Sequence, residues 1–188
     1  MVSTSKINET TVGIPQKGMY WCVPASIENL LRTEGINDIT QEDIIYEYLV
    51  LHFGNHSVDH PTKGISLLKD IDKNEMMNIF RQLPLQDISF QKLTSIVNNL
   101  IVSRGYNKSV TFIDGIKNND EYVSHIKNTL IKDKAVLISA SNNNGGWHII
   151  ITHQIDDEYL WSYDPASSQH IKVKISDYTF SHDILFIT

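Results

Sequence analysis

Apolar side chains recur at helical spacing through the first half of the chain, in segments that end near glycine or proline. Ile27, Leu30 and Leu31, for example, fall on one face of a helix. Thr40 and Asp43 have the spacing of a capping box, with aspartate in place of the usual glutamate or glutamine. The pattern predicts four helices: from Cys22 to Gly35, from Thr40 towards Gly54, over 74–83, and from Ser89 to Gly105.

The second half of the chain is predicted to form mainly strands. Short runs rich in β-branched and aromatic residues are bounded by turn sequences such as Asn142–Gly146 and Asp156-Asp157. Helices followed by antiparallel strands predict an α+β fold in one domain over 1–188, with residues 1–12 as a flexible tail. The predicted elements are a strand over 110–113, a helix over 120–131, and strands over 135–140, 147–153, 158–163, 170–175 and 184–187.

Composition narrows the classes of function. The 188 residues include 16 Lys and Arg and 22 Asp and Glu, a formal net charge of −6. This acidic balance argues against nucleic-acid binding and against an anionic membrane surface, since both require clustered Lys and Arg. No apolar run approaches the roughly 20 residues of a membrane helix, and the first residues lack the apolar centre of a signal peptide. We expect a protein that is cytoplasmic, or exported by a route without a cleavable signal peptide.

The single cysteine, Cys22, is the first candidate for chemistry. Because the sequence has only this cysteine, an intrachain disulfide and a cysteine-based zinc site are excluded. The N–H groups and dipole at a helix start favour an anion, so a thiol there tends to ionise to the nucleophilic thiolate. Gln16, in the preceding loop, could donate with the backbone N–H of Cys22 to an oxyanion. The alternatives are a small buried apolar side chain at Cys22 and a solvated loop residue at Gln16.

Two further candidates lie in the strand-rich half. His148 stands in the sequence WHIII, where a partly buried imidazole could act as general base for Cys22 and later protonate a leaving amine. Asp164 follows the strand over 158–163, and pairing of this strand with the one before it would bring Asp164 near His148. Its carboxylate would then fix the imidazole tautomer and favour the charged form. The alternatives are a core histidine without a chemical task and an ordinary Asp-Pro turn.

The order of these motifs resembles that of the papain-like cysteine peptidases. It is a loop glutamine with a helix-start cysteine, then the sequence WHII in a strand, then YDP after the next strand. In particular they resemble the bacteriocin-processing (double-glycine leader) branch and its stand-alone relatives. The resemblance implies a papain-like fold and a peptide or protein substrate that is hydrolysed through a thioester, with no cofactor and no metal. The roles that it implies are Cys22 as nucleophile, His148 as base, Asp164 as the residue that orients His148, and Gln16 as oxyanion donor.

The chain departs from that branch in two respects. Val23 separates Cys22 from Pro24, where the bacteriocin-processing peptidases usually have glycine, and the sequence has no membrane segment like those of the transporters to which they are fused. A free-standing peptidase, including a secreted or injected effector, fits the resemblance equally well. The same groups would also serve a transglutaminase, a deamidase or an acyltransferase, and a non-catalytic relative would only bind a peptide.

Other polar and aromatic residues were candidates for supporting roles. Trp21 and Trp147 are candidates to line a substrate groove, although tryptophans more often belong to a core or its rim. His153 is an alternative base, but its odd separation from His148 places it on the opposite face of a regular strand. No metal site is predicted, because Gly54 and the following polar loop interrupt the helix that regularly spaced histidine ligands would need. Those ligands would be His52, His56 and His60, with Asp59 among them.

Overall fold

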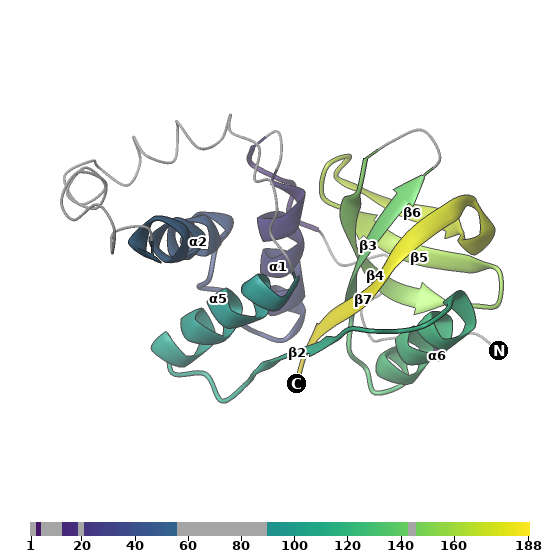
Figure 1. Ribbon diagram of the computed structural model, residues 1–188, viewed down its shortest axis with the longest axis horizontal. Helices are drawn as coiled ribbons and strands as arrows, with labels where there is room; N and C mark the ends of the chain where they lie inside the picture. The colour runs from purple at the N-terminus through teal and green to yellow at the C-terminus, as the bar shows by residue number, and fades with distance from the viewer. Residues whose placement is uncertain (1–2, 5–12, 19–20, 56–89, 143–145) are drawn as a thin grey trace.

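The computed structural model describes residues 3–4, 13–18, 21–55, 90–142 and 146–188. Helices precede most of the strands along the chain, so the α+β prediction is confirmed. Figure 1 shows α1, α2 and α5 beside a curved sheet, against which α6 also packs. The helices are α1 (Cys22–Thr33), α2 (Gln41–Asn55), α5 (Phe90–Ser103) and α6 (Asn119–Leu130). The strands are β1 (Ser3–Thr4), β2 (Val110–Ile113), β3 (Val136–Asn142), β4 (His148–Ile155), β5 (Tyr159–Asp164), β6 (Gln169–Lys174) and β7 (Tyr178–Ile187).

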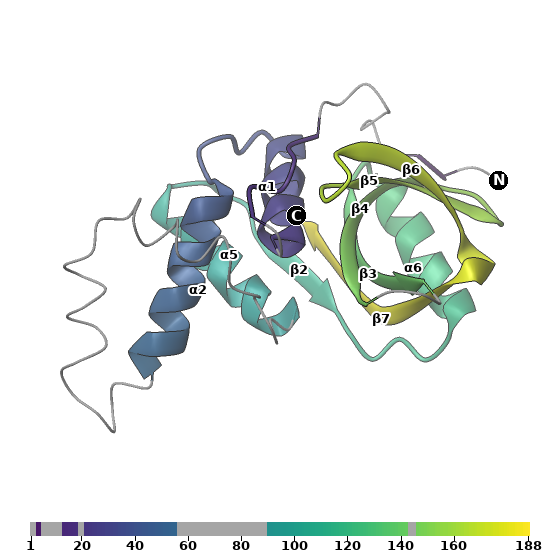
Figure 2. The same ribbon diagram turned by 90° about the horizontal axis from the view of Figure 1, so that it is seen from above.

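The strands form one antiparallel sheet in the order β2-β7-β3-β4-β5-β6, and β1 pairs with the end of β4. Seen from above, the sheet curls towards a barrel (Figure 2). The predicted pairing of β4 with β5 is present, with Ile151 opposite Tyr163. Asp156 shapes the turn between these strands, because its Oδ1 accepts from the N–H groups of Glu158 and Tyr159 at 2.8 and 2.7 Å. The end of β5 therefore lies beside the start of β4.

Apolar side chains cover both faces of the sheet, because successive residues of a strand point to opposite sides. On β4, Ile149 and Ile151 belong to a core shared with α1 and α5, whereas Ile150 belongs to a core shared with α6. Ser26 on α1 donates from Oγ to the carbonyl oxygen of Ile149 at 3.1 Å in this buried contact. This packing holds the start of α1 against the start of β4.

Local sequence explains several element boundaries. Gly35 and Gly105 have φ angles of +80° and +79°, in the left-handed region that glycine tolerates best, and they follow the ends of α1 and α5. Thr40 and Asp43 form the predicted capping box: the N–H of Thr40 donates to Asp43 Oδ2 at 3.0 Å, and the N–H of Asp43 donates to Thr40 Oγ1 at 3.4 Å. Asn118 caps α6, a cap that the sequence prediction missed.

The last strand is longer than predicted. β7 spans Tyr178–Ile187, whereas the apolar pattern indicated only 184–187. His182 has a φ of +62°, and the pairing of β7 with β3 shifts register between Ile138 and Ala140. Such an irregularity interrupts the alternation of apolar and polar residues, which hides the first half of the strand from a reading of periodicity.

Some sequence predictions fall outside the described residues. These are the helix over 74–83, the cap at Ser89, and most of the tail over 1–12, of which Ser3 and Thr4 form β1. The histidine-containing segment after α2 also lies there. Among the described helices, none combines the length and the apolar character that crossing a bilayer requires.

Candidate active site

Cys22 is the first residue of α1, and its thiol is half-buried. Trp21 occupies the N-cap position without a side-chain cap, so the sulfur lies at the end of the helix where N–H groups lack intrahelical partners. Backbone hydrogen bonds from Val23 and Ile149 reach the sulfur, and a side-chain hydrogen bond joins it to His148. The thiol therefore lies at the junction of α1 and β4.

His148 begins β4 and Asp164 ends β5, so the pairing of these strands brings the two side chains together. His148 donates from Nε2 to Oδ1 of Asp164 at 2.5 Å. The same carboxylate accepts from the N–H of Ala166 at 2.8 Å and from Ser167 Oγ at 2.9 Å. Because Nε2 is engaged, Nδ1 is the ring nitrogen that remains for the thiol of Cys22.

The contacts among these three groups reverse the effect of burial on their ionisation. Burial raises the pKa of the Cys22 thiol, but the hydrogen bond and charge of His148, with the two backbone bonds, outweigh it and hold the pKa below its ordinary value. Burial likewise opposes the charge of His148, yet Asp164 and Cys22 raise its pKa to about 9. At Asp164 the hydrogen bonds from His148 and Ala166 outweigh burial and lower the pKa to about 2. The contacts therefore favour the thiolate over the thiol at Cys22 and the imidazolium over the neutral imidazole at His148.

Gln16 lies in a loop that is fixed on two sides. Its N–H donates to the carbonyl oxygen of Pro165 at 3.0 Å, which ties the loop to the turn after β5. Gln41, fully buried at the start of α2, holds the residues on either side of Gln16. The Gln41 side chain donates from Nε2 to the carbonyl oxygen of Pro15 at 3.0 Å and accepts at Oε1 from the N–H of Lys17 at 3.0 Å.

A second amide side chain fixes the beginning of this loop. Asn29 on α1 accepts from the N–H of Ile14 at 2.7 Å and donates to the carbonyl oxygen of Ile14 at 2.8 Å. Sequence reasoning missed both Asn29 and Gln41. Each is a polar residue of a helix whose loop partners are distant along the chain, so no local pattern reveals the contact.

The two tryptophans predicted to line a groove differ in exposure. Trp21 is fully buried, and its ring packs against Gly18, where an added Cβ would lie 2.8 Å from ring atoms. The expectation for Trp21 is corrected, because a fully buried ring that packs against Gly18 is not accessible to a substrate. Trp147, directly before His148, is 57% exposed and stays a candidate for substrate contact.

His153, the alternative base, faces another histidine. It is 2% exposed, and its Nε2 lies 3.3 Å from Nδ1 of His170. Burial and the neighbouring charge of His170 lower its pKa to about 4. The pairing of β4 with β5 also has a bulge between Thr152 and Gln154, so the strand is not regular at this residue. The thiol of Cys22 is hydrogen-bonded to His148 and not to His153.

Comparison with known proteins places this fold in a family. The model of the Peptidase_C39 like family matches residues 6–182, a segment that contains the helices and nearly all of the sheet. A search of curated proteins found no match. Helices followed by an antiparallel sheet are also consistent with a papain-like fold. Since the match covers well over half of the 188 residues, the chain belongs to the Peptidase_C39 like family, within the papain-like cysteine peptidase superfamily.

Proposed function

We propose that the protein is a cysteine peptidase in which Cys22 is the nucleophile and His148 the general acid and base. Asp164 would orient His148, and Gln16 would donate to the oxyanion. Family membership supports a cysteine-peptidase-like function at the coarse level. The observation that carries the finer proposal is the series of hydrogen bonds from Asp164 through His148 to Cys22, at the start of α1. Such a series would supply an ionised nucleophile and a proton donor side by side.

In the first half of the reaction, the Cys22 thiolate attacks the carbonyl carbon of the scissile amide. A C–S bond forms and the carbonyl electron pair moves to oxygen, where the Gln16 amide and the backbone N–H of Cys22 would stabilise the negative charge. When the oxyanion collapses, the C–N bond breaks and the imidazolium of His148 gives its proton to the leaving amine. The products are a thioester on Cys22, a free amine and neutral His148.

In the second half, neutral His148 takes a proton from water while the water oxygen attacks the thioester carbonyl. Collapse of the second oxyanion breaks the C–S bond and releases a carboxylic acid. The thiolate and the imidazolium are restored, so no cofactor or metal is consumed. Asp164 holds the imidazole orientation in both halves and stays ionised, consistent with its low pKa.

A peptide-library digestion read by mass spectrometry tests the activity, with Cys22→Ala as the matched inactive variant. We expect cleavage products that disappear in Cys22→Ala and that carry a new carboxylate and a new amine. Release of ammonia from a glutamine peptide without chain cleavage would instead indicate a deamidase that uses the same catalytic residues. Products that persist in Cys22→Ala would refute a role for the thiol.

Alkylation of Cys22 by iodoacetamide between pH 5 and 9 tests the ion pair separately from any substrate. We expect the midpoint of the alkylation profile to lie below the free-thiol value of about 8.5, because the pKa of Cys22 is lowered. His148→Ala should move the midpoint back towards the free-thiol value of about 8.5. A wild-type midpoint already near that value would contradict an activated thiol.

A further inference from the structure

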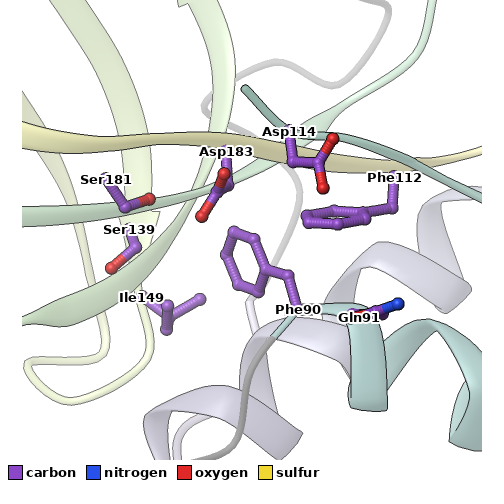
Figure 3. A pocket seen from close by; sticks show the side chains of 8 residues that line it. All are labelled: Phe90, Gln91, Phe112, Asp114, Ser139, Ile149, Ser181 and Asp183. Atoms are coloured by element: carbon purple, nitrogen blue, oxygen red, sulfur yellow. The ribbon is translucent and has the colours of Figure 1, made fainter. Parts of the chain in front are cut away.

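A cavity of about 290 Å³ lies between the start of α5 and the sheet (Figure 3). The rings of Phe90 and Phe112 meet edge to face in its wall, with centroids 6.2 Å apart, and Ile149 adds a further apolar surface. Since a water molecule occupies about 30 Å³ in the liquid, the cavity can hold one long side chain. Ile149 also links the cavity to the candidate active site, because its backbone is hydrogen-bonded to the sulfur of Cys22.

Two carboxylates enter the cavity from the strand side, Asp114 after β2 and Asp183 on β7 (Figure 3). Within the described part of the chain, neither side chain takes part in an ion pair or a hydrogen bond. Burial and the charge of Asp114 raise the pKa of Asp183, and the nearby His182 only partly offsets them. Two neighbouring like charges destabilise each other, and a cation between them would relieve that repulsion.

Two serine side chains of the same cavity also lack hydrogen-bond partners among the described residues. Ser139 on β3 is 9% exposed, and it lines the cavity. Ser181 on β7 has a buried Oγ without a partner. Buried polar groups are normally paired. Unpaired hydroxyls in the wall of a cavity therefore indicate a place that a polar ligand completes.

We propose that this cavity binds the side chain of a lysine or arginine of the peptide substrate, with Asp114 and Asp183 as the residues that select it. The aliphatic stem would lie against Phe90 and Phe112, and the cationic end would lie between the carboxylates with Ser139 as a further acceptor. The proposal rests on the proposed peptidase function. Because Ile149 directly follows His148, the selected residue lies close to the scissile bond.

Binding of matched peptides to the Cys22→Ala variant tests this proposal without turnover. Position-scanned peptides carry arginine or its neutral analogue citrulline, and lysine or norleucine, at each position in turn. We expect binding of the basic member to be tighter by 10-fold or more at one position, and the difference to fall below twofold when Asp114→Asn and Asp183→Asn are added. Asp120→Asn with Asp177→Asn, two exposed acids outside the cavity, gives the same change in net charge and should preserve the preference.

Equal binding of arginine and citrulline peptides at every position would overturn the proposal. So would a preference for basic peptides that survives loss of both cavity carboxylates. Digestion by the chain with Cys22 intact distinguishes this failure from failure of the proposed function. Cleavage without a basic preference would refute the cavity proposal alone, whereas selective binding without cleavage would refute the peptidase proposal alone.

Discussion

Gln41 offers a way to test how Gln16 is positioned without touching the candidate active site itself. Gln41→Ala removes the two 3.0 Å hydrogen bonds that hold Pro15 and Lys17 on either side of Gln16. Each such bond contributes about 1 kcal/mol net to stability, so the loop should loosen while the domain stays folded. A displacement of about 1 Å in a positioned group can cost roughly 100-fold in rate. Complete loss of an oxyanion donor costs about 100- to 1,000-fold in kcat, which is the upper limit for the effect.

We therefore expect Gln41→Ala to lower kcat by about 10- to 100-fold, with little change in the alkylation profile of Cys22. The sharper readout is a double-mutant cycle with Gln16→Ala. If Gln41 acts through Gln16, adding Gln41→Ala to Gln16→Ala should cause almost no further loss, because the donor is already absent. The matched control is Thr40→Ala. It removes the neighbouring side-chain cap of α2 at about 1 kcal/mol of stability but leaves the loop contacts in place.

Two outcomes would refute this reasoning. One is a folded Gln41→Ala protein with wild-type kcat, since the hydrogen bonds of Gln41 to Pro15 and Lys17 would then be irrelevant to catalysis. The other is a double variant whose loss in kcat equals the product of the two single losses, since Gln41 would then act independently of Gln16.

Three further predictions concern the imidazole and the loop contact with the sheet. Cleavage should fall above pH about 9, because His148, whose pKa is raised to about 9, then loses the proton that the leaving amine needs; a flat rate to pH 10.5 would contradict this. In Asp164→Asn the alkaline decline should move towards the ordinary histidine pKa of about 6.5, and an unmoved decline in the pH–rate profile would count against the ion pair. Gly13→Ala should lower the free energy of unfolding by about 1–3 kcal/mol, because its Cβ would lie 2.1 Å from the Tyr163 ring. The control is Gly146→Ala, which has no atom within 4 Å of the new Cβ and should match the stability of wild type in urea denaturation. If Gly13→Ala were as stable as Gly146→Ala, the Tyr163 ring would move aside without strain.

The parts of the fold that depend on neighbouring residues were predictable from the sequence. The Thr40–Asp43 box and the stops at Gly35 and Gly105 each act within one helical turn, so local chemistry determines them. The β4–β5 hairpin is similarly local, and it carries the prediction that Asp164 lies near His148. What remained hidden depends on contacts between distant segments: the hydrogen bonds of Gln41 to the loop around Gln16, the insertion of β7 between β2 and β3, and the burial of Trp21.

Cys22 combines a feature that local sequence predicts with one that depends on distant residues. Its place at a helix start followed from the apolar pattern after it, and with it came the expectation of an acidic thiol. The lowered pKa, however, depends mainly on His148, which is far along the chain. Composition and periodicity do not indicate how close Cys22 and His148 lie in space. Only the resemblance of the ordered motifs to a known family supported their meeting in advance.

The place of β7 in the sheet also has a consequence for the order in which the sheet assembles. The final strand of the chain occupies an interior position, with β2 on one side and β3 on the other. Until β7 (Tyr178–Ile187) pairs, β2 is separated from the other described strands and β3 has one open edge, even when the β4–β5 hairpin has formed. Long-range strand pairing of this kind forms slowly. We therefore expect the sheet to close late in folding, after the β4–β5 hairpin that carries His148 and Asp164 has formed.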